Sequence, residues 1–225
     1  MTAVGPGARA ERNGAAASAP GDVADRIARQ SLAARAADYA GEVRRLLDAA
    51  LELMRTGGTV APSRVADIVA AAGLSNDAFY RHFKSKDALV AALLEDGTER
   101  LYGYVAHRMG KAHTPADRVR AWVAAIMVQA DAEIAATTRA VLWNASGAGQ
   151  GVVSGAGAAG VRLAHLLHAP FAELGSATPE FDASLAGHAT IGKLAEFLWE
   201  RTEPTPPDID HIAEACLRIA AASGG

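Results

Sequence analysis

Three observations in the sequence predict an all-α protein. Apolar residues recur at spacings of three and four, the period of a helix, along much of the chain. Thr followed by Pro, with an acidic residue within three positions, marks strong helix starts at Thr114, Thr178 and Thr205. No segment shows the alternation of apolar and polar residues that is typical of a half-buried strand. Helices alone should therefore form the core.

Length and composition bound the class of protein. With 225 residues, half of them hydrophobic, the chain is long enough for one or two domains with a sizeable core. The net charge of −3 excludes an overall basic field, so any binding of nucleic acid must depend on local charge. Cys216 is the single cysteine, which excludes an internal disulfide and a cysteine-based zinc site. Because no apolar run reaches the roughly 20 residues of a membrane helix, and no secretory signal is recognisable, we expect a soluble cytoplasmic protein.

The N-terminal third begins with a segment that has little to bury. Residues 1–21 are rich in Ala, Gly and Pro, and we expect them to be disordered. Residues 22–38 contain helix formers and three arginines, which leaves two interpretations open: a basic arm that reaches the DNA backbone or minor groove, or a loosely docked helix. From Val43 to Met54 an unbroken apolar stripe predicts a helix that ends at Gly57 and supports the next motif.

Residues 63–94 read as three short helices separated by single-residue signals. The first has one apolar face and ends at Gly73, a residue suited to a left-handed C-terminal cap. Ser75 is a good N-cap for a second helix of about two turns, anchored by Phe79 and Phe83. Ser85 can cap a third. Two helices joined by a tight turn, the second short and polar-faced, indicate a helix-turn-helix, whose second helix enters the major groove of DNA.

The charges of this motif favour DNA as its partner. Lys86 would stand in the first turn of a helix, where a cation opposes the helix dipole unless an anion such as phosphate docks there; a solvated lysine is the alternative. We predict that the phosphate backbone is held by Tyr80, His82 and Lys86, and that base edges are read by Asn76, Asp77 and Arg81. The full predicted DNA-binding set is Ser75, Asn76, Asp77, Ala78, Tyr80, Arg81, His82 and Lys86.

The segment AAAGLSNDAFYRHFKSKDALVAALL resembles the signature of TetR-type transcriptional regulators. The resemblance is close from Glu42 to Leu94, and beyond it extends only to the all-helical character. It implies a homodimeric repressor that binds a palindromic DNA operator and leaves it when a small molecule enters the C-terminal domain. Asp77 stands where the family often has Gly, and it could read a cytosine amino group or only favour the helix dipole.

The domain boundaries that we expect follow from this resemblance. Residues 1–38 form a flexible or partly helical extension, 39–86 the helix-turn-helix DNA-binding domain, and 87–225 a helical ligand-binding and dimerisation domain. A helix from Lys86 to near Met109 should link the last two domains, and further helices are predicted from Pro115, from Ala132 to Ala145, around 161–171, and from Pro179 and Pro206.

Two sets of residues in the predicted C-terminal domain are candidates for binding. A pocket between helices would be lined by Trp122, Ile126, Arg139, Trp143 and His165. Since charges are few there, the effector should be largely hydrophobic, with at most one anionic or carbonyl group. The last two helices would pair two copies across a two-fold axis through the region of Phe181, Leu185, Leu194, Leu198, Ile212 and Ile219.

Signals of other chemistry are weak. Residues 155–160 satisfy GxGxxG, but the dinucleotide fingerprint needs a preceding strand, and the match is expected by chance in a Gly- and Ala-rich tract. His165 and His168 lack the further ligands of a metal site, and no Ser stands in a nucleophile elbow. We therefore predict that the protein has no catalytic, metal or cofactor site and that it is not an enzyme. The alternative is a helical small-molecule-binding protein or enzyme that keeps the helix-turn-helix only as a structural element.

Overall fold

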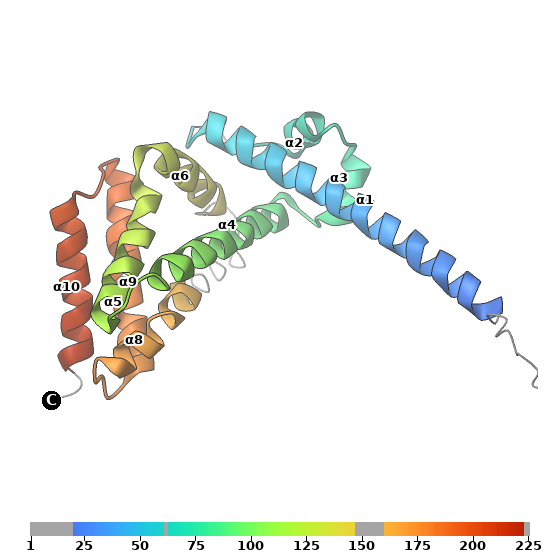
Figure 1. Ribbon diagram of the computed structural model, residues 1–225. Helices are drawn as coiled ribbons and strands as arrows, with labels where there is room; N and C mark the ends of the chain where they lie inside the picture. The colour runs from blue at the N-terminus through green and yellow to red at the C-terminus, as the bar shows by residue number, and fades with distance from the viewer. Residues whose placement is uncertain (1–19, 61–62, 147–159, 223–225) are drawn as a thin grey trace, which may run out of the picture. The chain divides into compact units, whose positions relative to one another are not determined.

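The computed structural model describes residues 20–60, 63–146 and 160–222 (Figure 1). Within these ranges all regular structure is helical, which confirms the predicted fold class. The expected disorder of the N-terminus concerns residues that, up to 19, lie outside the described ranges, as does most of the GxGxxG tract. The chain divides into two compact units, residues 1–41 and 42–225.

The first helix, α1 (Pro20–Gly57), begins in the first unit and ends in the second. It is one continuous helix, because its sequence contains no proline after Pro20 and, beyond Gly21 in the first turn, only Gly41 as an internal glycine. Every residue from Asp22 to Gly41 is exposed, including the apolar Ile27 and Leu32. In the first unit α1 therefore has no buried face.

A small helical head forms the start of the second unit. It consists of α1 from Glu42 onward, α2 (Val65–Ala72), α3 (Asn76–His82) and the first turns of α4 (Lys86–Met109). These bounds agree with the sequence prediction because the signals are local: Gly73 caps α2 at φ 64°, and the hydroxyls of Ser75 and Ser85 accept the amides of Ala78 (3.1 Å) and Ala88 (3.2 Å). The head core contains Leu46, Ala50, Met54, Ile68, Phe79, Leu89 and Val90.

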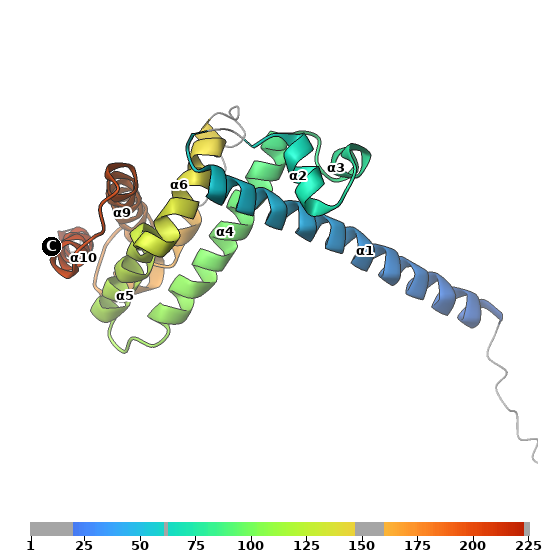
Figure 2. The same cartoon turned by 90° about the horizontal axis from the view of Figure 1, so that it is seen from above.

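The body is a bundle arranged around α5 (Pro115–Met127), as Figures 1 and 2 show. Against α5 pack α4, α8 (His168–Glu173), α9 (Pro179–Glu200) and α10 (Pro206–Ala222). The short 3-10 helix η1 (Val128–Ala130) leads from α5 to α6 (Ala132–Ser146). Trp122 lies fully buried in this core and donates its Nε1–H to the Leu163 carbonyl oxygen at 2.9 Å. No helix of the described residues is long and apolar enough to cross a membrane.

One predicted helix is wrong. The sequence predicts a single helix around 161–171, but residues 160–165 are helical, Leu166 and Leu167 form a turn, and α8 begins at His168. The amides of both leucines reach back only three residues, to Leu163 (3.2 Å) and Ala164 (2.9 Å). Pro170 has no N–H to continue an α-helical ladder through this point, and it lies instead in the first turn of the new helix, where no such bond is needed.

α5, α9 and α10 all start where the Thr-Pro signals predict, but the capping hydrogen bond differs at α9. Thr114 accepts the amide of Asp117 at 3.1 Å, a side-chain N-cap. Thr178 makes no such bond. Before α9 the hydroxyl of the buried Ser176 instead accepts a hydrogen bond from the Thr178 amide at 3.2 Å and donates one to Asp182 at 2.6 Å.

Substitution by alanine should have opposite effects on stability at two glycines of α9. A Cβ at Gly187 would lie 2.7 Å from the Cβ of Ala164, too close without a shift of backbone, whereas Gly192 has nothing within 4 Å. Gly187→Ala should destabilise the fold, because overpacking costs about 1 to 3 kcal/mol, more than the roughly 1 kcal/mol by which a helix favours Ala over Gly. Gly192→Ala should stabilise it by up to about 1 kcal/mol. Urea unfolding of both variants measures the two signs; equal effects would contradict the close packing at Gly187.

Candidate nucleic-acid interface

The recognition candidate is α3, a helix of seven residues with one buried and one exposed face. Phe79 is fully buried, and its ring lies 5.8 Å from that of Phe83. These two rings attach α3 to the head core, while Asn76, Asp77 and Arg81 stay exposed on the other side. Because the two buried rings hold one face of α3 against the core, the opposite face presents polar side chains to the solvent.

The structure places the remaining predicted DNA-binding residues in different ways. Ser75 and Tyr80 are exposed, with the Tyr80 ring edge-on to Phe79 at 5.2 Å. Lys86 is half-buried in the first turn of α4, and Ala78 is buried, so its side chain faces the core. Only the backbone of Ala78 can therefore contact DNA.

His82 points inward, although its sequence position suggested an exposed donor. Its side chain has no exposed surface, and Nε2 lies 2.6 Å from Oε2 of Glu42 on α1. The same Oε2 accepts a hydrogen bond from Nη2 of Arg81 at 2.7 Å. Hydrogen bonds from His82 and then from Arg81 hold the pKa of Glu42 below its usual value. The carboxylate is therefore ionised and only accepts, which requires a hydrogen on Nε2 of His82.

Sequence reasoning missed Glu42 as a member of this site. It lies 39 residues before Arg81 and 40 before His82, so no local spacing connects them. Only the crossing of α1 over α3 brings the three side chains together.

A cationic edge adjoins this face. Arg81 is compensated by Glu42, but no ion pair joins Lys84 or Lys86 to a carboxylate among the described residues. Both lysines stand close to the N-terminus of α4, where backbone N–H groups attract anions. An exposed polar helix beside such an edge can contact base edges and phosphates at once.

Comparisons with known proteins decide the family of this motif. Residues 46–93 match the model of bacterial regulatory proteins of the tetR family. Over these 48 residues the chain is similar to the tetR family of bacterial regulatory proteins. No curated protein sequence matches the chain.

Solved structures extend the similarity to the TetR fold as a whole. A protein of Pseudomonas aeruginosa PAO1 classed as a transcriptional regulator is 21% identical, with a TM-score of 0.64 over 80% of this chain and 90% of that one. A TetR regulator of Rhodococcus sp. RHA1 is 21% identical (TM-score 0.60; 81% and 97%). The regulator FadR of Bacillus subtilis, solved with stearoyl-CoA, is 16% identical (TM-score 0.57; 80% and 98%). At these identities the similarity shows a shared fold.

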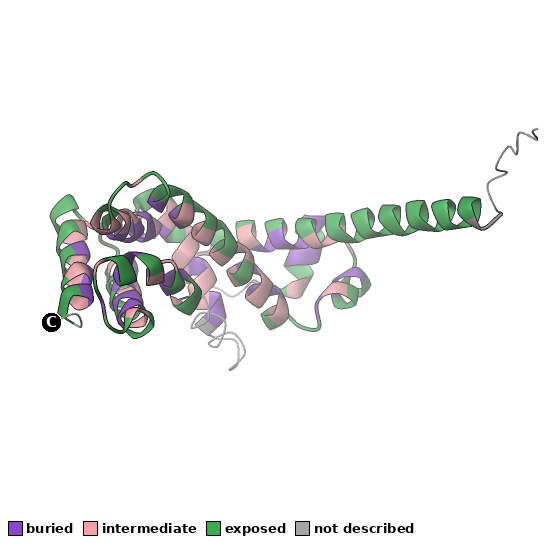
Figure 3. Cartoon of the chain, turned by 60° about the horizontal axis from the view of Figure 1, so that its bottom comes forward, coloured by how far each residue is buried: buried purple, intermediate pink, exposed green. Residues whose placement is uncertain are grey.

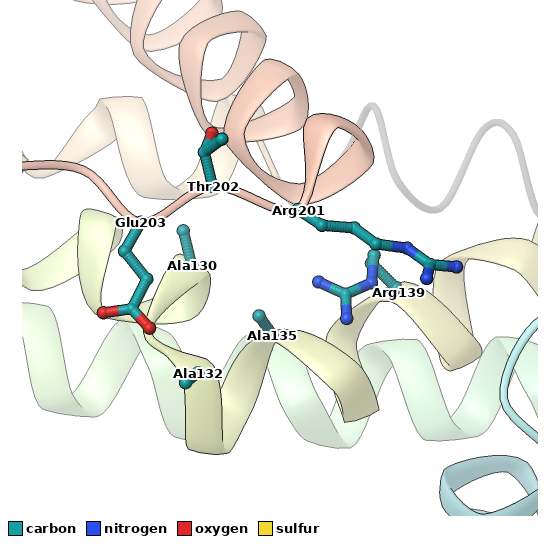
Figure 4. Close-up of a pocket in the computed structure, with 7 residues that line it drawn as sticks. All are labelled: Ala130, Ala132, Ala135, Arg139, Arg201, Thr202 and Glu203. Carbon is teal, nitrogen blue, oxygen red and sulfur yellow. The ribbon is translucent and has the colours of Figure 1, made fainter.

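The body has a pocket between the start of α6 and the loop after α9 (Figure 4). Its volume is about 180 Å³, and it is lined by Ala130, Ala132, Ala135, Arg139, Arg201, Thr202 and Glu203. Arg139 is half-buried, with Nη1 3.4 Å from the carbonyl oxygen of Leu198. Of the five predicted effector residues, Arg139 alone lines this pocket.

The other predicted effector residues lie elsewhere in the body. Trp122 and Ile126 are fully buried in the core, and Trp143 on α6 is half-buried. His165 is exposed, with its ring 4.4 Å from that of His168. Within the described ranges no three His, Cys, Asp or Glu residues gather as metal ligands.

The predicted dimer residues differ in how far they are buried, a property by which Figure 3 colours the chain. Phe181 and Leu185 are 69% and 49% exposed, but Leu194 and Leu198 are only 7% and 1% exposed and belong to the body core. Ile212 and Ile219 on α10 are half-buried. An interface on α9 would therefore use Phe181 and Leu185, and not Leu194 or Leu198.

Proposed function

We propose that the chain is a ligand-responsive, homodimeric transcriptional repressor that binds a palindromic operator through α3 and is released by a largely hydrophobic effector. The observation that carries this proposal is the polar, exposed face of α3, fixed by buried Phe79 within a TetR-family domain. Asn76, Asp77 and Arg81 would meet base edges in the major groove. Tyr80 and Lys86 would contact phosphates and set the register of the helix.

Selection from a pool of random DNA duplexes tests the proposal directly. The full-length protein should enrich an inverted repeat whose half-sites lie about 10 base pairs apart, or a multiple of that distance, because two copies of α3 must enter the major groove on one side of the duplex. Enrichment of no motif would refute operator binding. Enrichment of a single half-site would refute the symmetric dimer.

The role of Lys86 makes a separate prediction on the selected duplex. Lys86→Ala should weaken binding to all DNA sequences alike and reduce the slope of log K against log salt by about 1 per half-site, since each phosphate contact releases a counterion. The salt dependence of binding measures this slope. Lys111→Ala, an exposed lysine after α4, is the matched control and should leave it unchanged. Equal slopes for wild type and Lys86→Ala would remove Lys86 from the phosphate contacts.

A hydrophobic effector fits the chemistry of the body. The core around α5 is formed by apolar and aromatic side chains, among them Trp122, Ile126 and Phe171. A highly charged molecule would lose its solvation there without partners. FadR of Bacillus subtilis, a protein of similar fold, was solved in complex with stearoyl-CoA, which supports a hydrophobic effector for this chain.

One helix, α4, belongs to both the body and the head. α4 contributes Leu89, Val90 and Leu93 to the head core, and Val105 and Met109 to the body core. An effector that binds better to the DNA-free arrangement can shift this single helix, and with it the position of α3.

Tryptophan fluorescence makes the effector hypothesis testable. Trp199 is 49% exposed and would add background, so a Trp199→Phe variant leaves Trp122 and Trp143 as reporters. In a screen of small molecules, those that release the selected duplex should be largely hydrophobic and should change this fluorescence over the same concentration range. Release by multiply charged molecules only, or with unchanged fluorescence, would contradict a hydrophobic site in the body.

A further inference from the structure

We propose that Glu42 is a positioning residue for DNA recognition, which fixes the guanidinium of Arg81 and thereby sets the base preference of α3. The inference rests on the proposed function and assigns part of its specificity to a residue on α1, outside the helix-turn-helix. It is carried by the three-residue cluster of Glu42, Arg81 and His82.

The geometry of the cluster restrains Arg81 from one side only. Oε2 of Glu42 lies 2.7 Å from Nη2 of Arg81 and 2.6 Å from Nε2 of His82. The Arg81 side chain is still 56% exposed, whereas Glu42 is 27% exposed and His82 has no exposed surface. A guanidinium has five donors in a rigid plane, so the bond through Nη2 orients the group and leaves other N–H groups for DNA.

Glu42 and His82 are both held in place by buried neighbours. Glu42 precedes by one turn of α1 the fully buried Leu46. His82 ends α3 and is followed by buried Phe83. The carboxylate therefore joins two anchored helices, and its position is not that of a freely moving surface side chain. A charged group held in place before binding loses less conformational freedom when it contacts a base.

A merely structural ion pair would behave differently. If Glu42 only joined α1 to α3, its loss would lower stability and weaken binding to every DNA sequence by the same factor. If it positions Arg81, its loss should remove discrimination at the base pair that Arg81 reads. The distinguishing readout is thus base preference position by position, and not affinity alone.

The chain offers a matched control on the same helix. Glu52 pairs with Arg55 three residues away, with Nη2 2.6 Å from Oε1, and both side chains are more than half exposed. Glu52→Gln removes an ion pair of α1 that does not touch α3. It should leave base preference unchanged.

The experiment selects the same pool of random duplexes in parallel with full-length wild type, Arg81→Ala, Glu42→Gln, Glu42→Asp and Glu52→Gln. Arg81→Ala identifies the position that Arg81 reads. Glu42→Gln removes the charge, and Glu42→Asp keeps it but shortens its reach by one methylene group. Circular dichroism establishes that each selected variant is folded, and the aspartate variant provides the test if the glutamine variant does not fold.

We expect both Glu42 variants to lose preference at that same position by about tenfold, a factor of ten being about 1.4 kcal/mol, with the other positions retained. The Glu52 variant should select the wild-type motif. A folded Glu42 variant that keeps the full wild-type motif would overturn the inference while operator binding stands. If wild type itself selects no motif, the proposed function has failed instead.

Discussion

Phe79→Ala should unfold the DNA-binding head and abolish operator binding. Phe79 is among the largest fully buried side chains, and its removal leaves a cavity in the head core. Truncation of a buried phenylalanine to alanine costs about 3 to 5 kcal/mol. With seven residues, α3 is also too short to stay helical without this anchor. Urea unfolding and binding to the selected duplex should register both losses.

Phe79→Leu is the matched control for this prediction. It retains most of the apolar volume, so it should cost less than the alanine variant and preserve binding. An alanine variant as stable as the wild type would contradict the anchoring of α3 by Phe79.

Phe181→Glu should separate the proposed dimer and reduce operator affinity by about 100-fold or more, because two linked heads gain 10²- to 10⁴-fold from binding together. Phe181 is 69% exposed in the single chain, so glutamate there should hardly disturb the fold. In an apolar interface the same charge would be buried without a partner. Sedimentation and operator binding measure the two effects on one preparation.

Leu194→Glu provides the comparison on the same helix. Leu194 is 7% exposed and packs in the body core, so a charge there should unfold the chain before it affects assembly. A Phe181→Glu variant that stays dimeric would place the interface away from this face of α9.

Local signals explain why much of the head could be predicted from sequence. Gly73, Ser75 and Ser85 each act within a few residues of their position, and the structure uses each as its type suggests. The starts of α5 at Thr114 and α10 at Thr205 depend on the same kind of local bond.

Contacts between distant segments could not be predicted in this way. Glu42 meets Arg81 and His82 across about 40 residues, and nothing in the local pattern pairs them. On α9, apolar residues lie on both faces, so helical periodicity could not separate exposed Phe181 from buried Leu194. The faces are distinguished only by the packing of α9 against the rest of the body.

The most direct test of the central claim compares two duplexes of equal length, the selected inverted repeat and its scrambled sequence, across about 50 to 200 mM salt. If α3 reads DNA as proposed, the repeat should bind at least about 1,000-fold more tightly than the scrambled duplex, and the affinity for both should fall as salt rises. Equal affinity for the two duplexes, or binding that does not respond to salt, would contradict the account.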